Sequence, residues 1–369
     1  MESTSINRAG GGIMRRTSEA WTLLLTTASA VLLSGCSAAS SNTLAGGTAK
    51  PFVAAPGPSV APIKHAGTPN STTSTTEPNL PVPPALVPFA NHTTAGEGVW
   101  SSAGRLVHGF PAVYETRLFP PGGSQSAGIA WMDTRLLSAR LYSGSRSPGG
   151  GPYKYTAPIQ PAQAASLVAA FNGGFLMGAA HGGYYTEGRV IYPLVPGAAS
   201  LVIYSDGSAN VGAWGSDVSM ASNVVSVRQN LVPLVAAGQP TTVAASPDWQ
   251  EWGATCGATS CTGPGLEYQW RSALGVTSDG ALVYVTGPAL NPMQLAQLLV
   301  RAGAIRGMEL DINPYWTVFA TYDPALDGIA APSNGSKLLS STVQGPGTFF
   351  EGWWARDFIT MSERSAPTS

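Results

Sequence analysis

The sequence predicts a mixed α/β (α+β) fold, in which a single domain has a mixed, mostly antiparallel sheet with helices packed on it. The prediction rests on two hairpin signals, two helix signatures and a short apolar run after the second helix. Glycine accounts for 44 of the 369 residues and charged residues for 11%, which is typical of a turn-rich and sheet-rich secreted domain. We place the domain at residues 96–362 and expect a flexible tail at residues 363–369.

Short apolar runs mark the expected strands. Residues 126–132 are apolar enough for a buried strand, and residues 135–142 loosely alternate polar and apolar side chains. Two hairpins are expected because Asp-Gly favours the positive φ angles of a tight turn. The first hairpin would have a strand at residues 201–204 and its turn at Asp206-Gly207. The second would have a strand at residues 273–277, its turn at Asp279-Gly280 and the return strand at residues 281–286.

Two segments have helix signals. Residues 161–170 begin with a proline, which suits the first turn, and continue with good helix formers. Residues 292–302 follow Asn291, a candidate N-cap, and precede Gly303, a candidate residue for the C-terminal cap. Residues 308–312 are then expected to form a strand.

The N-terminus combines a positive region with a short apolar core. Arg15 and Arg16 precede the apolar residues 21–33, and Leu33-Ser34-Gly35-Cys36 follows. The pattern predicts a signal peptide over residues 1–35 and resembles the lipobox of bacterial lipoproteins, in which the cysteine becomes the lipid-carrying N-terminus. Ordinary secretory cleavage with an incidental Cys36 is the alternative. We therefore expect an extracytoplasmic protein, anchored through lipid to the outer face of the cell membrane.

Residues 36–95 are mostly Ala, Ser, Thr and Pro and lack hydrophobic periodicity. Such a segment buries too little apolar surface to offset the entropy of ordering, so we expect a disordered tether.

Charge and cysteine usage limit the partners. The formal net charge of -1 argues against nucleic acid, because neutralising phosphates requires a basic excess. In an oxidising compartment Cys256 and Cys261 could close a local disulfide. A metal site is the competing interpretation, and without a nearby histidine it is a poor one. We predict no cofactor; a divalent cation at Asp311 is the alternative, which no ligand cluster supports.

The first polar segment is Asn172-Gly173-Gly174. Its glycines would let the backbone approach a ligand closely, and Asn172 offers a donor and an acceptor. A helix C-terminal turn is the alternative. Downstream, Tyr185 and Glu187 supply an aromatic face and a carboxylate of the kind that bind sugars, although a surface loop could hold them without a role.

Two further segments place charge beside expected strands. Arg271 opens an apolar strand, where its guanidinium could bind phosphate or carboxylate, or form a structural salt bridge. Glu309, Asp311 and Asn313 would share one face of a strand, with the two carboxylates about 6.5 Å apart along it. In dry surroundings such proximity raises one pKa and separates an acid from a base, whereas a solvated polar face is the competing explanation.

These segments resemble the motifs of the phosphodiester glycosidase domain family, over about residues 167–316 and more faintly over 126–361. The family patterns are Asn-Gly-Gly-Phe, Arg-Thr-Ala-Ile-Gly-Val and Asn-Leu-Asp-Gly-Gly-Gly-Ser. The positions that match them are Asn172, Gly173, Gly174, Arg271 and Asp311. The chain looks most like an actinobacterial lipoprotein branch of that family.

The chain departs from the family after Asp311. Ile312-Asn313-Pro314-Tyr315 stands where the family has Gly-Gly-Gly-Ser, and Glu309 replaces an asparagine. A glycine nest presents several backbone N–H groups to phosphate, but Pro314 has none. The departure weakens the phosphate half of the implied substrate more than the sugar half.

The resemblance implies a surface glycosidase that hydrolyses a glycosyl phosphodiester or a related cell-envelope glycan. Asp311 would be the acid or the nucleophile or base, with Glu309 as its partner, and Arg271 would neutralise the leaving group. Substrate contacts are expected from Asn172, Gly173, Gly174, Tyr185, Glu187 and Asn313. A non-catalytic glycan-binding or envelope-assembly lipoprotein is the alternative.

Other hydrolase classes lack their signatures, since the sequence has neither a Gly-x-Ser-x-Gly elbow nor a His-Glu-x-x-His zinc motif. The C-terminal residues 349–358 are expected to form a closing strand of the core. Within them we expect Arg356 and Asp357 to pair, and sugar stacking by Trp353 or Trp354 is the alternative to a purely structural role.

Overall fold

The computed structural model describes residues 78–89, 94–245, 252, 268–325 and 328–365, all within one compact unit that runs from Thr72 to Ser369. The predicted signal peptide, Cys36, Cys256 and Cys261 lie outside the described residues. No helix in the described ranges is long and apolar enough to cross a membrane.

Both predicted edges of the domain need correction. Leu80, placed in the tether, is 2% exposed and donates its N–H to Asp133 Oδ2 at 2.7 Å. At the other end, Glu363 closes the last strand and Arg364 donates to three backbone carbonyls. Described residues on both sides of the range 96–362 therefore pack on the domain.

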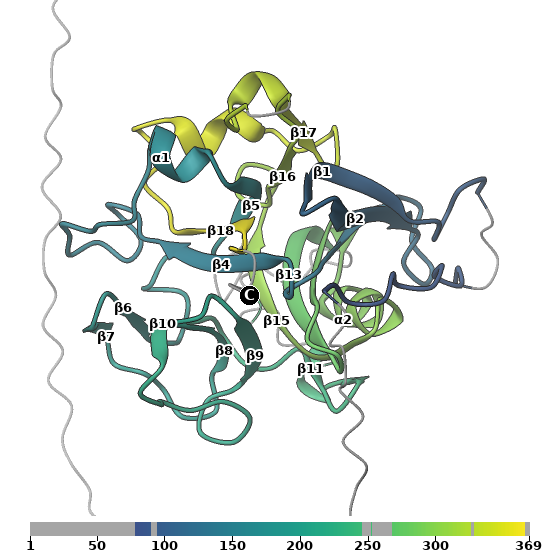
Figure 1. The fold of residues 1–369 in the computed structure, drawn as a ribbon. Helices are drawn as coiled ribbons and strands as arrows, with labels where there is room; N and C mark the ends of the chain where they lie inside the picture. The colour runs from purple at the N-terminus through teal and green to yellow at the C-terminus, as the bar shows by residue number, and fades with distance from the viewer. Residues whose placement is uncertain (1–77, 90–93, 246–251, 253–267, 326–327, 366–369) are drawn as a thin grey trace, which may run out of the picture. The chain divides into compact units, whose positions relative to one another are not determined.

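The predicted α/β class is wrong, because the described residues form a β protein of three antiparallel sheets. The strands of each sheet are given in spatial order. The first sheet contains β1 (Ser101–Val107), β2 (Phe110–Leu118), β3 (Ala127–Met132), β14 (Leu282–Leu290), β13 (Gln269–Thr277), β15 (Ala304–Ile312), β11 (Val235–Ala236) and β12 (Gln239–Pro240). The second sheet contains β7 (Arg189–Tyr192), β6 (Tyr184–Thr186), β10 (Val224–Gln229), β8 (Ala199–Tyr204) and β9 (Ala209–Ala213), and the third contains β17 (Gly335–Lys337), β16 (Phe319–Tyr322), β5 (Leu167–Asn172), β18 (Phe358–Glu363) and β4 (Leu137–Tyr142). Figure 1 shows the second sheet on one side of β4, and β16, β17 and α1 on the other.

Helices are few in the described residues. They are α1 (Pro161–Ala164), α2 (Pro292–Arg301) and the short 3₁₀ turns η1 (Val243–Ala245), η2 (Pro332–Asn334) and η3 (Pro346–Phe350). The predicted helix at residues 161–170 is wrong, because it ends after one turn and the chain continues into β5. Every residue of β5 is buried between β16 and β18. A short, wholly buried apolar run has no periodicity that separates helix from strand, and here sheet pairing decides.

The predicted hairpins are confirmed, with one difference in the turns. β8 pairs with β9 across Asp206-Gly207, and β13 pairs with β14 across Asp279-Gly280. Only the glycines have positive φ, at +80° and +92°. Asp206 instead accepts the N–H and hydroxyl of Ser208 on Oδ1, which holds its turn from the side chain.

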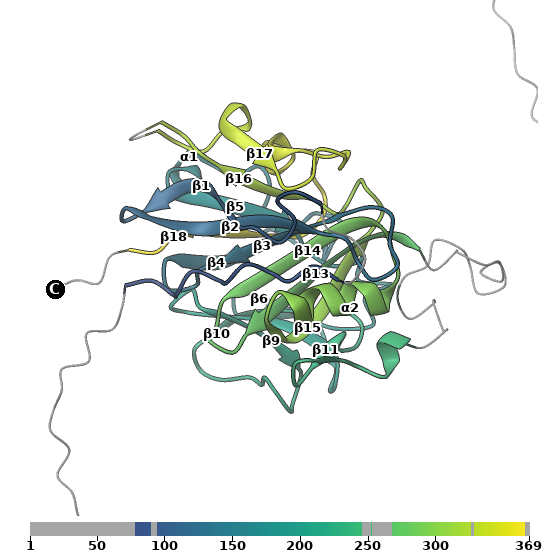
Figure 2. The same cartoon turned by 90° about the vertical axis from the view of Figure 1, so that its right-hand side faces the viewer.

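The helix α2 is confirmed with both expected ends. Asn291 Oδ1 accepts the N–H of Gln294 at 2.8 Å, and Gly303 follows with φ +90°. Figure 2 shows α2 lying against the first sheet. Gly275 and Gly307 make room for it, because a Cβ would lie 3.2 and 2.7 Å from the Leu299 side chain.

We expect Asn291→Ala to destabilise the protein by about 1 kcal/mol, because an N–H of the first turn of α2 loses its acceptor. Asn291→Ser keeps an acceptor and is the matched control, with a loss of only a few tenths of a kcal/mol. Urea denaturation of both variants checks this. Equal losses in the two variants would show that the cap does not contribute.

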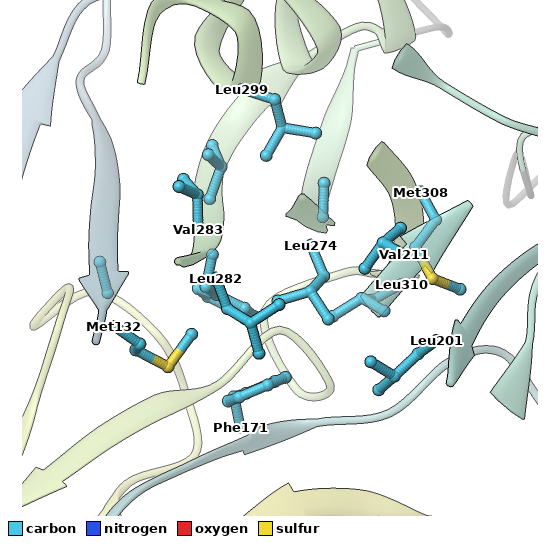
Figure 3. Packing of buried hydrophobic residues seen from close by; sticks show 14 of the residues in the cluster. Met132, Phe171, Leu201, Val211, Leu274, Leu282, Val283, Leu299, Met308 and Leu310 are labelled. Atoms are coloured by element: carbon cyan, nitrogen blue, oxygen red, sulfur yellow. The ribbon is translucent and has the colours of Figure 1, made fainter. Parts of the chain in front are cut away.

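The three sheets share one core (Figure 3). Leu274 and Leu310 come from the first sheet, Leu201 from the second and Phe171 from the third, and all are at most 1% exposed. The predicted closing strand at residues 349–358 is misplaced, since it covers the end of η3 and a loop. The strand that closes the third sheet is β18, between β5 and β4.

Candidate functional site

Segments from all three sheets meet at one group of charges. β15 of the first sheet ends beside Asp311, and β10 of the second sheet carries Arg228. In the third sheet, Phe358 at the start of β18 pairs with Asn172 at the end of β5, so Arg356 and Asp357 enter at the same place. Residues far apart in the sequence are thereby brought together.

A β-bulge separates the two carboxylates that sequence reasoning placed on one face. Ala273 pairs with Glu309 and Arg271 pairs with Ile312, so β15 has one more residue than β13 between these pairs. Directly paired residues share a face, which puts Glu309 with Arg271 on the side covered by α2. The backbone of Asp311 bonds instead to Ser272, whose side chain points to the opposite face. The predicted Glu309–Asp311 pair is therefore not formed.

Glu309 and Arg271 form a structural ion pair. Both side chains are 0% exposed, with Arg271 Nη1 2.5 Å from Glu309 Oε1. Arg271 also donates to the carbonyls of Leu290 and Trp252, each at 2.8 Å. Burial raises the pKa of Glu309, and Arg271 opposes that rise. This is the structural salt bridge that was the alternative interpretation of Arg271, and a substrate cannot reach either buried side chain.

The amide of Asn172 is used entirely by the protein. Its Nδ2 donates to Gly173 O at 2.8 Å and to Ser272 Oγ at 3.1 Å. Its Oδ1 accepts from the Tyr284 hydroxyl at 2.7 Å and from Val318 N at 3.2 Å. With two donors and two acceptor positions occupied, Asn172 ties the first sheet to the third and has no capacity left for substrate hydroxyls.

Gly173 and Gly174 are needed for packing against a second buried ion pair. A Cβ on Gly173 would lie 2.3 Å from Asp357 Oδ2, and one on Gly174 would lie 2.8 Å from Arg228 Cζ. Arg228 Nε contacts Asp357 Oδ2 at 2.7 Å, and the two side chains are 1% and 0% exposed. Ser147 donates its hydroxyl to Asp357 Oδ1 at 2.9 Å.

The predicted pairing of Arg356 with Asp357 is thus wrong, because adjacent strand-entry residues point apart. Arg356 pairs with Asp311 Oδ2 and also donates to Gly174 O at 3.1 Å. Its guanidinium lies over Trp316, with Cζ 4.6 Å from the ring centroid. Arg356 is therefore held by a carboxylate, a carbonyl and an aromatic face.

Arg356 lines a cleft of about 370 Å³, which we call the Arg356 cleft. The other described lining residues are Arg146, Leu176, Trp316, Trp353 and Ala355. Trp353 is 57% exposed and neighbours Trp354, their ring centroids 5.7 Å apart. An aromatic wall with two guanidinium groups suits a ligand that combines a sugar ring with negative charge.

Asp311 lies behind Arg356 with its side chain 4% exposed. Burial raises its pKa to about 7, while Arg356 and the N–H of Ile312, which donates to Oδ1 at 2.8 Å, limit the rise. A carboxyl group that titrates near neutral pH can exchange a proton with a bound ligand.

The remaining predicted binding residues do not reach the Arg356 cleft. Tyr185 packs with the apolar side of the second sheet. Glu187 accepts the N–H groups of Lys154 and Tyr155 and so fixes that segment. Asn313, with φ +67°, accepts the N–H of Tyr315 on Oδ1 and shapes the turn that leads to Trp316.

Sequence reasoning missed Arg146, Trp316 and the role of Arg356. Asn313-Pro314 signals a turn, which could have suggested that the following aromatic residues are presented rather than buried. Nothing in the sequence pairs Arg356 with Asp311. Among the described residues, no group of three or more His, Cys, Asp or Glu side chains is arranged to hold a metal ion.

No protein-family model matches the chain, and no curated protein matches it. Among solved structures, it is similar to the zebrafish N-acetylglucosamine-1-phosphodiester alpha-N-acetylglucosaminidase catalytic domain, auto-inhibited by its pro-peptide, with 16% identity and a TM-score of 0.41 over 72% of this chain and 88% of that chain. It is also similar to a hypothetical protein from Synechocystis, with 12% identity and a TM-score of 0.38 over 72% of this chain and 64% of that chain. At these values the similarity concerns the fold alone.

Proposed function

We propose that this protein is a glycosidase that hydrolyses a glycosyl phosphodiester in the Arg356 cleft. The observation that carries the proposal is one carboxyl group with a pKa near 7, Asp311, in contact with an arginine on the wall of an aromatic cleft. Trp316 and Trp353 would receive the sugar ring. Arg356 and Arg146 would receive the phosphate.

The number of carboxylates favours a phosphodiester over an ordinary glycoside. Glycosidases acting on neutral glycosides use two carboxyl groups, since an alcohol leaving group needs a proton. None of the described residues lining the cleft is a carboxylate: Asp311 lies behind Arg356, Asp357 is buried with Arg228 and Glu309 with Arg271. A phosphomonoester leaves as a stable anion and needs charge screening instead of a proton, which arginines supply.

The proposed step balances as a hydrolysis. A water oxygen bonds to the anomeric carbon while the bond from that carbon to the phosphate oxygen breaks. The phosphate keeps the electron pair, and Asp311 accepts the water proton as general base. For this, Arg356 turns from Asp311 to the incoming phosphate, so substrate binding uncovers the base. In this proposal the two guanidinium groups bind the phosphate, which Pro314 and its neighbours cannot do as a glycine nest would.

The activity should rise with pH. Because the base must be ionised and the pKa of Asp311 is about 7, kcat/KM falls about tenfold per pH unit below 7 and reaches a plateau above it. Initial rates between pH 5 and pH 9 check this. A rate that is highest in acid and declines through pH 7 would assign Asp311 the role of an acid.

A matched pair of substrates tests the proposal. One is a hexosyl phosphodiester, and the other is the hexoside of the same alcohol without phosphate. We expect free hexose only from the first, with oxygen from ¹⁸O-labelled water in the sugar and none in the phosphate. Label in the phosphate, or equal hydrolysis of the two substrates, would contradict the mechanism.

A non-catalytic glycan-binding or envelope-assembly role is the second candidate. It is favoured by the fact that both Asp311 oxygens are engaged, one by the N–H of Ile312 and one by Arg356. Binding of the hexosyl phosphodiester by the wild type without any hydrolysis would establish this role in place of the first.

We further propose that the protein acts outside the cytoplasm, anchored by lipid at Cys36. The supporting feature is the sequence Leu33-Ser34-Gly35-Cys36 after an apolar run. Metabolic labelling with a fatty acid should label the wild type and not Cys36→Ser. Equal labelling of the two would refute the anchor.

A further inference from the structure

A second polar depression lies along β4, near the end of β18 that is remote from the Arg356 cleft. It consists of two hollows of about 410 and 250 Å³ that share the lining residues Ser138, Arg140, Tyr155 and Asp206. We call the two together the β4 groove. Arg356 precedes β18, whereas Ser362 and Glu363 at its far end line the groove. A strand of six residues spans about 17 Å, so the two sites are distinct.

Strand register defines the floor of the groove. Arg140 pairs with Thr360 and Ser138 pairs with Ser362 between β4 and β18. Side chains of cross-strand partners share a face and lie about 5 Å apart, and residues two positions apart on one strand lie about 6.7 Å apart. One guanidinium and three hydroxyls therefore stand close together on one face, although Thr360 among them is only 2% exposed.

Arg140 is the cation of this floor and has no hydrogen bond or ion pair with any described residue. Its Cζ lies 4.1 Å from the centroid of the Tyr155 ring, which orients the guanidinium while leaving its N–H groups available. Tyr155 is itself fixed, because its N–H donates to Glu187 Oε1 at 3.1 Å. The free cation is thus positioned before any ligand binds.

The carboxylates around the groove are already engaged. Asp206 accepts the N–H and hydroxyl of Ser208, and Glu187 accepts the N–H groups of Lys154 and Tyr155. Glu363 faces the His108 ring at 3.6 Å. Arg364, the other arginine of the lining, donates to the carbonyls of Asp206, Thr134 and Leu137. Arg140 is therefore the cation of the lining whose N–H groups are not used by another described residue.

The hydroxyls of the floor are also unused. Within the described part of the chain, Ser138, Thr360 and Ser362 have no side-chain hydrogen bond, and neither has Ser166 beside them. Hydroxyls both donate and accept, which is what a polyol requires. We propose that the β4 groove binds an acidic oligosaccharide, with a sugar carboxylate on Arg140 and sugar hydroxyls on the serine side chains. Binding here is independent of hydrolysis in the Arg356 cleft.

The test is calorimetric titration of the full chain with a trimer of galacturonic acid. We expect binding that weakens tenfold or more in Arg140→Gln, because a charge-assisted contact is lost. Arg117→Gln, which removes an exposed arginine of β2 outside the groove, should bind as the wild type does. Ser362→Ala should weaken binding a few-fold.

Three ligand controls separate the parts of the proposal. The methyl-esterified trimer, which lacks the charges, should bind at least tenfold more weakly than the acid. Equal binding of a tri-glutamate peptide, or full displacement by an equal concentration of sulfate, would overturn the assignment to a sugar. No binding of the acid trimer by folded wild type, or unchanged binding by folded Arg140→Gln, would overturn the site.

Discussion

Asp311→Asn should reduce hydrolysis of a hexosyl phosphodiester roughly 10²–10⁴-fold, the range over which a positioned general base contributes. The asparagine keeps the shape of the side chain and one acceptor oxygen, enough for one of the two donors that Asp311 now serves, Ile312 N and Arg356. It cannot accept a proton from water. We therefore expect substrate binding to persist while turnover is lost, as measured by initial rates and by calorimetry.

Glu309→Gln is the matched control for this variant, because the sequence predicts Glu309 as the catalytic partner of Asp311. The bulge in β15 puts Glu309 on the face covered by α2, paired with Arg271. Its loss should lower stability and leave kcat within a few-fold of the wild type, measured on protein whose fold is verified by circular dichroism. An equally inactive, folded Glu309→Gln would restore the two-carboxylate site.

Arg228→Met should cause the largest loss of stability, about 3–5 kcal/mol, because Asp357 would stay buried with an uncompensated charge. The pair joins β10 of the second sheet to the residue that precedes β18 of the third. In thermal unfolding this corresponds to a decrease in Tm of roughly 6–20 °C.

Arg189→Met provides the comparison, since it makes the same substitution in a surface pair. Arg189 Nη2 lies 3.9 Å from Glu187 Oε2, and the side chains are 43% and 23% exposed. We expect a loss below about 1 kcal/mol. Equal decreases in Tm for the two variants would mean that the buried pair does not hold the sheets together.

Local signals in the sequence predicted the elements whose geometry is local. The cap at Asn291 and the glycine at Gly303 define α2, and Asp-Gly defines the two hairpins. The prediction for β5 was wrong because a short, fully buried run such as Leu167–Asn172 has no periodicity that distinguishes a helix from a strand. Its partner strands β16 and β18 are distant in sequence. The predicted fold class was wrong for this reason and because strands such as β1, β2, β10 and β16 were not predicted, so the helices were given too much weight.

The candidate site failed in a more specific way. Asp311, a carboxylate between apolar residues, was predicted from the sequence and lies beside the Arg356 cleft, where its role is proposed. Regular alternation along a strand would place Glu309 on the same face as Asp311, but one extra residue in β15 puts the two side chains on opposite faces. The predicted Arg356–Asp357 pair failed for a different reason: adjacent residues before β18 point apart, so Arg356 pairs with Asp311 and Asp357 with Arg228. Such pairings depend on register and tertiary packing.

The most direct test of the proposed function is a crystal structure with an unreactive glycosyl phosphonate analogue. We predict phosphonate oxygens within hydrogen-bond distance of Arg356, the sugar against Trp353, and Asp311 released from Arg356 and facing the anomeric carbon. An analogue bound away from Arg356, or one that leaves the contact between Arg356 and Asp311 intact, would contradict the account.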